Sequence, residues 1–185
     1  SMLDAQRTTF TRYNNDTHPE IGVDDVWAVM STPDGAIWFG TSESGLYRLA
    51  PDGGLQRFVS DPDDPRSLPS NGVSALLPAV DGTLWVGTKN GVAQWTGRDF
   101  VRMPMPPGTS RMINGLVFDS GADLWIGGHG DGVVRRANGH IERMPELDPV
   151  LNAPVLHMLV EDRQGARWFD TRSELAREID GRMED

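Results

Sequence analysis

The chain has 185 residues, enough for one substantial core, and its hydrophobic content of 38% is ordinary for a folded domain. Its net charge of −10 argues against nucleic acid as a ligand, because binding a phosphate backbone needs a basic face. The lack of cysteine excludes disulfides and thiolate metal sites, and no apolar run reaches the roughly 18 residues of a membrane span. We expect contact with a membrane only through segments outside this chain.

The first predicted strand is Phe10 to Tyr13, and a polar turn follows it. The apolar run Val26 to Met30 is typical of a strand buried on both faces. Three further short strands follow, separated by turns rich in aspartate and glycine. Residues 20–59 therefore predict a four-stranded antiparallel meander.

The same unit recurs along the chain, each time marked by a turn and a tryptophan, and in the first three units by a glycine two residues after the tryptophan. The four repeat tryptophans are Trp38, Trp85, Trp125 and Trp168, which are 47, 40 and 43 residues apart. This period is typical of propeller blades. It predicts blades at roughly 20–59, 70–103, 111–144 and 153–179. Each tryptophan lies mid-strand beside apolar neighbours, so we expect it to pack between blades and not to bind a sugar.

The fourth repeat departs from the pattern. Asp170 stands where the earlier repeats have Gly40, Gly87 and Gly127, and no outer strand is obvious after Ile179. The chain also begins with a strand that has no preceding blade, residues 10–13. We expect that strand to complete the last blade, because propellers hide their sheet edges in this way.

Two stretches resemble a known family. Asp81 to Val92 matches a pattern like D-G-x-L-W-h-G-T-x-x-G-L, where h is apolar, and Asp61 to Asn71 matches a connector D-P-x-x-P-x-S-L-x-x-N. Both are similar to the two-component regulator propeller repeat. The resemblance implies an all-β fold, a β-propeller built of four-stranded antiparallel blades. It also implies the extracytoplasmic sensor region of a bacterial receptor, whose histidine kinase or diguanylate cyclase output domain lies outside this chain.

About four blades fit in this chain, whereas rings of that family usually have more. Three arrangements follow: a small closed ring, an open piece of a larger ring, or two chains that close an eight-bladed ring. An open piece would expose the apolar flank of its terminal blades. We therefore expect a homo-oligomer, a dimer in which residues 10–13 of one chain finish the last blade of the other.

Catalytic and metal-binding patterns are weak. Asp34 and Asp81 precede glycine and are expected to be turn residues. The acidic cluster of the connector, residues 61–64, lacks the ligand spacing of a calcium loop. The four histidines are too scattered for a zinc site, and no nucleophile and base pair is recognisable. We predict no catalytic residues, no metal and no cofactor.

Geometry indicates a binding face. In propellers, the turn between the second and third strands and the loop leading into each first strand lie at one end of the ring. The polar residues expected there are Asp24, Asp25, Glu43, Asn71, Lys89, Asn90, Arg111, His129, Asp131, Asn152 and Arg172. Trp27, in an innermost strand, is better placed to contact a ligand than the repeat tryptophans.

This mixed charge suits a small polar ligand, although another protein domain is an alternative partner. We expect a non-enzymatic ligand-sensing module at the periplasmic or extracellular face of a bacterial membrane protein. Two alternatives remain open: a fragment of a propeller enzyme of the lyase or glycosidase type, and a purely structural platform for protein interactions.

Overall fold

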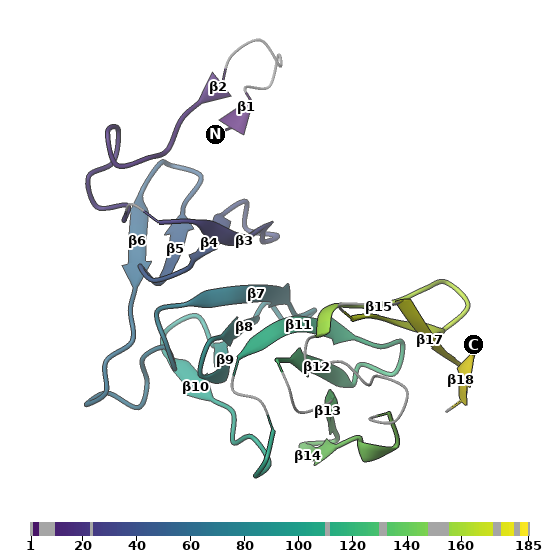
Figure 1. Ribbon diagram of the computed structural model, residues 1–185. Coiled ribbons are helices and arrows are strands. Elements are labelled where there is room, and N and C mark those ends of the chain that lie inside the picture. The colour runs from purple at the N-terminus through teal and green to yellow at the C-terminus, as the bar shows by residue number, and fades with distance from the viewer. Residues whose placement is uncertain are drawn as a thin grey trace.

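The computed structural model describes residues 2–3, 10–22, 24–109, 112–129, 133–147, 156–171, 175–179 and 182–184. Four antiparallel sheets of four strands follow one another along the chain, and each sheet forms one blade (Figure 1). The first blade contains β3 (Val26–Ser31), β4 (Ile37–Thr41), β5 (Leu46–Leu49) and β6 (Leu55–Phe58). The second contains β7 (Val73–Pro78), β8 (Leu84–Thr88), β9 (Gly91–Trp95) and β10 (Phe100–Arg102).

The third and fourth blades repeat this order. The third contains β11 (Ile113–Phe118), β12 (Leu124–Gly128), β13 (Val133–Ala137) and β14 (His140–Arg143). The fourth contains β15 (Leu156–Glu161), β16 (Arg167–Thr171), β17 (Leu175–Ile179) and β18 (Arg182–Glu184), and a short 3-10 helix, η1 (Pro145–Leu147), precedes it. The predicted all-β propeller with four-stranded antiparallel blades is confirmed. No helix in the described part of the chain is long and apolar enough to cross a membrane.

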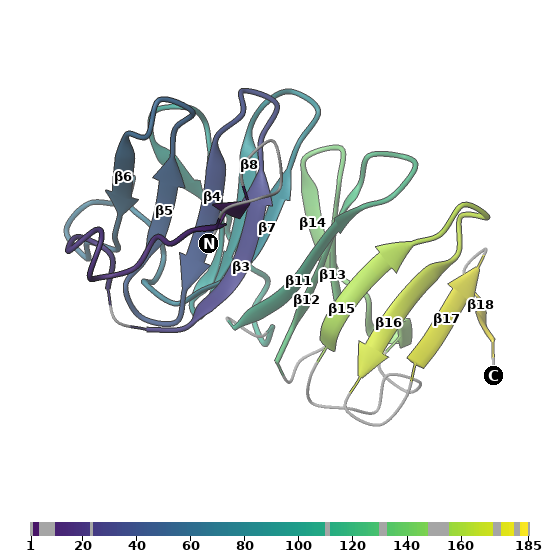
Figure 2. The same cartoon turned by 90° about the horizontal axis from the view of Figure 1, so that it is seen from above.

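The blades lie side by side in an open row, and the four sheets do not close into a ring (Figure 2). The innermost strands contact one another in sequence, β3 with β7, β7 with β11, and β11 with β15. The chain thus forms an arc, and the arrangement as a small closed ring is wrong. Both ends of the arc present a blade flank that has no neighbouring blade on it.

The first three blades are in close contact at Gly40 and Gly87, each two residues after a repeat tryptophan. A Cβ atom on Gly40 would lie 2.9 Å from the carbonyl oxygen of Val73 and would overlap its side chain. A Cβ on Gly87 would lie 2.8 Å from Cγ2 of Ile113. The first strand of the following blade therefore rests directly on the glycine, an approach that any side chain would block. Asp170 occupies this position in the fourth blade.

The repeat tryptophans pack toward the following blade. Trp38, Trp85 and Trp125 are 3%, 5% and 3% exposed, and each belongs to a cluster with apolar side chains of the next blade. Trp168 is only half-buried. Its lower burial follows from its position, because the fourth blade is the last in the described chain. A repeat tryptophan is therefore buried where a following blade covers it and partly exposed where no blade follows.

The opposite flank of the first blade is also uncovered. In β3, Val26 is 55% exposed and Val29 is 69% exposed, whereas Val73 and Ile113 at the position of Val26 are buried. The prediction that residues 26–30 form a strand buried on both faces is therefore wrong. Burial of this strand depends on a preceding blade, which this chain does not place there.

The N-terminal segment covers part of this flank. Ile21 is 6% exposed, and the amide of Gly22 donates to the hydroxyl of Tyr47, which itself donates to the carbonyl oxygen of Glu20 (3.0 and 3.2 Å). Figure 1 shows β2 standing apart from the first blade, so the contact with the blade is made by the residues that lead into β3. The segment shields the outer strands of the first blade and leaves β3 exposed.

The edge strands differ from the prediction. Phe10–Thr11, as β2, pairs with β1 (Met2–Leu3) and not with the fourth blade. The fourth blade has its own outer strand, because β18 pairs with β17. Residues 10–13 therefore do not complete the last blade of this chain. The sequence of β18, Arg-Met-Glu, is too short and polar to predict a strand by pattern alone.

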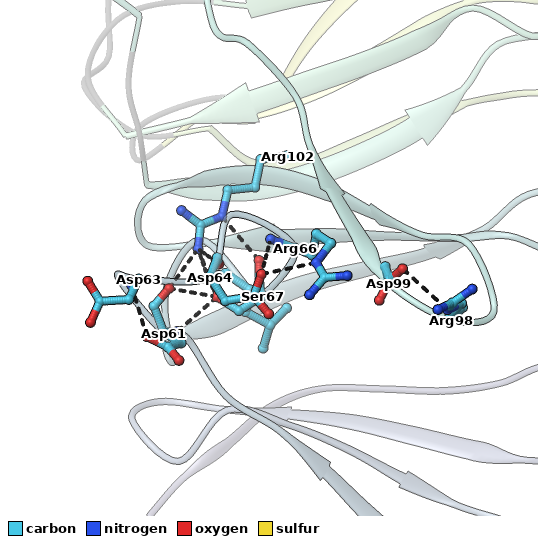
Figure 3. Close-up of polar contacts among 9 residues, drawn as sticks. Asp61, Asp63, Asp64, Arg66, Ser67, Arg98, Asp99 and Arg102 are labelled. Atoms are coloured by element: carbon cyan, nitrogen blue, oxygen red, sulfur yellow. Dashed lines mark hydrogen bonds and ion pairs between the residues drawn. The ribbon is translucent and has the colours of Figure 1, made fainter.

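The connector before the second blade is held by one arginine. Arg102 donates hydrogen bonds to the Ser67 hydroxyl (2.8 Å) and to the carbonyl oxygens of Asp61 and Leu68 (3.3 and 3.0 Å), as Figure 3 shows. The carboxylates of Asp61 and Asp64 accept backbone amide bonds inside the connector. Their role is that of turn residues. In the described part of the chain, no group of three acidic or histidine side chains could hold a metal ion.

Candidate ligand-binding site

The turns between second and third strands lie at one end of the blades, together with the segments that lead into each first strand. We call this end the loop face. The structure brings three side chains together there, Trp27, Glu43 and Lys89, and we call them the Trp27 cluster. Trp27 lies on the first strand of the first blade, Glu43 in a turn of the same blade, and Lys89 in the matching turn of the second blade. The cluster thus bridges two blades.

Lys89 is held in place along its whole length. Its amide donates to the carbonyl oxygen of Gly72 (2.8 Å), and its stem lies so close to Gly72 that a Cβ there would be 2.5 Å from Cδ. The ammonium lies 4.8 Å from the centre of the Trp27 ring, within the range of a cation–π contact, and 2.5 Å from Oε1 of Glu43. The side chain remains 29% exposed, so the only lysine of the chain is both fixed and accessible.

Asp24 positions the turn that carries Glu43. Its Oδ2 accepts hydrogen bonds from the amides of Glu43 and Ser44, both at 2.7 Å. Its Oδ1 is buried and has no hydrogen-bond partner among the residues that the structure describes. The side chain of Glu43 is 71% exposed, and its carboxylate is paired with the Lys89 ammonium. Asp24 therefore fixes the backbone of the turn that carries Glu43.

Four other predicted residues lie in the described part of the chain: Asp25, Asn71, Asn90 and His129. The carbonyl oxygen of Asp25 accepts a bond from the Ser42 amide, and Asp25 is exposed. Asn71 has a structural role, because its Oδ1 accepts the Ser60 amide at 2.7 Å. Asn90 and His129 are exposed on turns of the second and third blades.

Four predicted residues lie outside the described part of the chain: Arg111, Asp131, Asn152 and Arg172. Of the predicted residues, the structure brings Asp24, Glu43 and Lys89 together. Trp27, which the sequence places in an innermost strand and favours over the repeat tryptophans for ligand contact, lies beside Lys89.

Comparisons with known proteins fit this arrangement. Residues 67–90, which run from the end of the connector through β7 and β8, match the model of the family described as two component regulator propeller. The chain carries a two component regulator propeller repeat. This confirms the recognition made from the motif and the connector. A comparison with curated proteins finds no match.

Solved structures show the fold of the repeat array. The extracellular domains of two proteins described as hybrid two component systems of B. thetaiotaomicron are 20% and 21% identical to this chain, with TM-scores of 0.73 and 0.71. Each match covers 86% of this chain but only 23% and 22% of the other. Virginiamycin B lyase from Staphylococcus aureus matches at 16% identity and a TM-score of 0.65, over 86% of this chain and 54% of the lyase. The chain thus has the propeller fold and spans less than a quarter of the two B. thetaiotaomicron domains.

Proposed function

We propose that this chain is a non-enzymatic ligand-sensing module of a bacterial signal-transduction receptor, located outside the cytoplasm. The Trp27 cluster is the observation that carries the proposal. An exposed ion pair contributes at most about 1 kcal/mol, so a ligand can open the pair of Lys89 and Glu43 at little cost. The two component regulator propeller repeat and the fold shared with extracellular domains of hybrid two component systems support a sensing role over a catalytic one.

The ligand would be a small polar molecule bound across the first two blades. Its acidic or hydroxyl groups would take the place of Glu43 on the Lys89 ammonium, and an apolar surface would lie on the exposed part of the Trp27 ring. Because the cluster draws residues from two blades, binding would favour one relative position of those blades over others. A shift of that kind is the signal that a receptor could transmit.

Lys89→Ala is expected to weaken the binding of such a ligand about tenfold, because a hydrogen bond to a charged group contributes roughly 1.5 kcal/mol or more. The ligand would first be found by a thermal-shift screen of sugars, amino acids and nucleotides and then titrated by calorimetry. Arg163→Ala is the control, since Arg163 is an exposed cation in a turn of the fourth blade. Equal affinity in the two variants would argue against the Trp27 cluster, and a screen without any response would argue against a small ligand.

We also propose that two copies of the chain associate through the exposed flank of β3. Covering Val26 and Val29 would remove apolar surface from water, which is the main driving force of association. Head-to-tail closure of an eight-bladed ring is disfavoured. In such a ring the first blade of one copy would follow the fourth blade of the other, and Val26 would lie against Asp170, at the position where the first three blades have glycine. Burying that carboxylate against valine would be costly. A symmetric contact of two β3 flanks avoids it.

Light scattering on the purified chain tests this association. The expected result is a dimer for the unmodified chain and a monomer for Val29→Glu, which places a charge in the contact. Val80→Glu is the matched control, because Val80 is fully exposed in a turn away from this flank. A monomer at every concentration of the unmodified chain would contradict the proposal.

A further inference from the structure

A groove of about 800 Å³ lies between the first and second blades, at the end opposite the loop face. Its rim comes from the β3–β4 turn, with Thr32 and Asp34, and from the β9–β10 turn, with Arg98. Phe58 and Trp95 line its floor. The volume is within the range of small-molecule sites, roughly 300 to 1,000 Å³. No residue of this groove belongs to the Trp27 cluster.

The floor is aromatic. The rings of Trp38 and Phe58 stack at 5.7 Å with an interplanar angle of 18°, and Trp95 lies 4.8 Å from Phe58. Trp38 is buried, but Phe58 and Trp95 are each half-buried and leave part of their rings toward the groove. Such a surface favours a flat, apolar group, because aromatic pairs add about 0.5 to 1.5 kcal/mol to the burial of their area.

The equivalent positions between later blades are occupied by charged side chains. Strand register places Arg136 of the third blade and Glu178 of the fourth where the second blade has Trp95. Arg136 lies 5.3 Å from the ring centre of Trp85, and the groove there is smaller, about 540 Å³.

Between the third and fourth blades, Arg167 lies 4.2 Å from the ring centre of Trp125 and pairs with the buried Glu178. Arg48 of the same blade lies 5.8 Å from the ring centre of Trp38, but only in the second and third junctions does the following blade place a cation over the repeat tryptophan. In the first junction the same place is lined by aromatic rings from both blades. The first groove therefore offers an aromatic surface to the ring of a ligand, whereas the two later junctions have charged side chains in that place.

The charges at the rim complement an anion. Arg48 forms an ion pair with Asp34 at 2.8 Å. Hydrogen bonds from the Thr32 hydroxyl and from Arg48 lower the pKa of Asp34 to about 2, so the carboxylate is charged and the charges of Arg48 and Asp34 cancel. Arg98 is different, since its side chain is 87% exposed and its contact with Asp99 is loose, at 3.7 Å (Figure 3). A guanidinium has five N–H donors in a planar fork that matches a carboxylate. Most of those donors on Arg98 face solvent.

We propose that the groove between the first two blades binds a small aromatic carboxylate. The ring would lie against Phe58 and Trp95, and the carboxylate would take both donors of one edge of the Arg98 guanidinium. This site is separate from the Trp27 cluster and does not depend on it. The chain would accordingly respond to ligands at both ends of the same pair of blades.

Phenylacetate is a suitable probe, and phenylacetamide is its neutral counterpart of the same shape. Titration followed by NMR of the full chain is expected to show binding of phenylacetate in the millimolar range, with shifts at the indole N–H of Trp95. Arg98→Gln is expected to weaken this binding about tenfold, because a charge-assisted pair of hydrogen bonds is lost. Arg163→Gln makes the same charge change in the fourth blade and is expected to bind as the unmodified chain does.

Three outcomes would overturn the proposal. The first is no binding of phenylacetate at millimolar concentration. The second is equal affinity for phenylacetate and phenylacetamide, which would leave no role for Arg98. The third is an equal loss in Arg98→Gln and Arg163→Gln, which would indicate attraction to net charge and not to a site. Because Arg98 is exposed, its substitution is not expected to affect folding, and a thermal unfolding curve checks this.

Discussion

Gly40→Ala is expected to destabilise the chain by about 3 kcal/mol, in the upper range for overpacking of a tight contact. The new methyl group would meet the side chain and the carbonyl oxygen of Val73, so the second blade would have to move away from the first. Backbone atoms on the other side of the contact leave little room for relaxation. The measurement is urea unfolding, where the midpoint falls and the slope stays constant.

Gly54→Ala is the control for this change. A Cβ on Gly54 would meet only Oδ1 of Asp52, at 3.2 Å, and that exposed side chain can turn away. A change of less than about 0.5 kcal/mol is expected there, as for most surface substitutions. Similar losses in the two variants would show that the glycine at position 40 serves chain flexibility and not the approach of the next blade.

Arg167→Met is expected to cost about 4 kcal/mol, because it removes one partner of a buried ion pair. Glu178 is 2% exposed, and its Oε2 accepts a 2.5 Å bond from Nε of Arg167. Asp119, on the third blade, lies 3.5 Å from the same guanidinium. Without the arginine, a carboxylate would be buried between two blades with less compensation. Urea or thermal unfolding measures the loss.

The first blade supplies the matching double variant. Its residues at these two positions are Ile37 and Leu49, which pair across β4 and β5 as Arg167 and Glu178 do across β16 and β17. Arg167→Ile combined with Glu178→Leu is expected to recover most of the stability, since apolar residues often replace a buried ion pair without loss. A double variant as unstable as Arg167→Met would show that the ion pair itself, and not the cost of burying the Glu178 carboxylate without Arg167, stabilises the fourth blade.

The repeat could be derived from the sequence because its signals are local. The tryptophan, the glycine that follows it and the turn residues sit within about ten positions of each other, and strand period and turn chemistry act over that distance. The pairing of turn residues at the loop face followed from the same regularity. Glu43 and Lys89 occupy matching turns of adjacent blades, so their approach was predictable once the blades were counted.

The predictions of secondary structure and burial that proved wrong concern strands of the first and last blades. Val26 to Met30 was predicted to be buried because the run is almost entirely apolar, and the sequence of one repeat does not show whether a preceding blade covers it. The outer strand β18 was missed because Arg182 to Glu184 has no apolar pattern, and its hydrogen bonds to β17 decide its conformation. The two proposed ligand sites depend on pairs of residues far apart in the chain, such as Trp27 with Lys89 and Phe58 with Trp95.

The sequence by itself determined the blade and its strand order, because these depend on residues a few positions apart. Only the tertiary structure decided that the sheets stay open, which flank of β3 meets water, and what fills each junction between blades. The physical reason is that burial is a property of two surfaces. A strand can specify its own apolar face, but only the presence or absence of a second surface makes that face a core, a groove or a site of association.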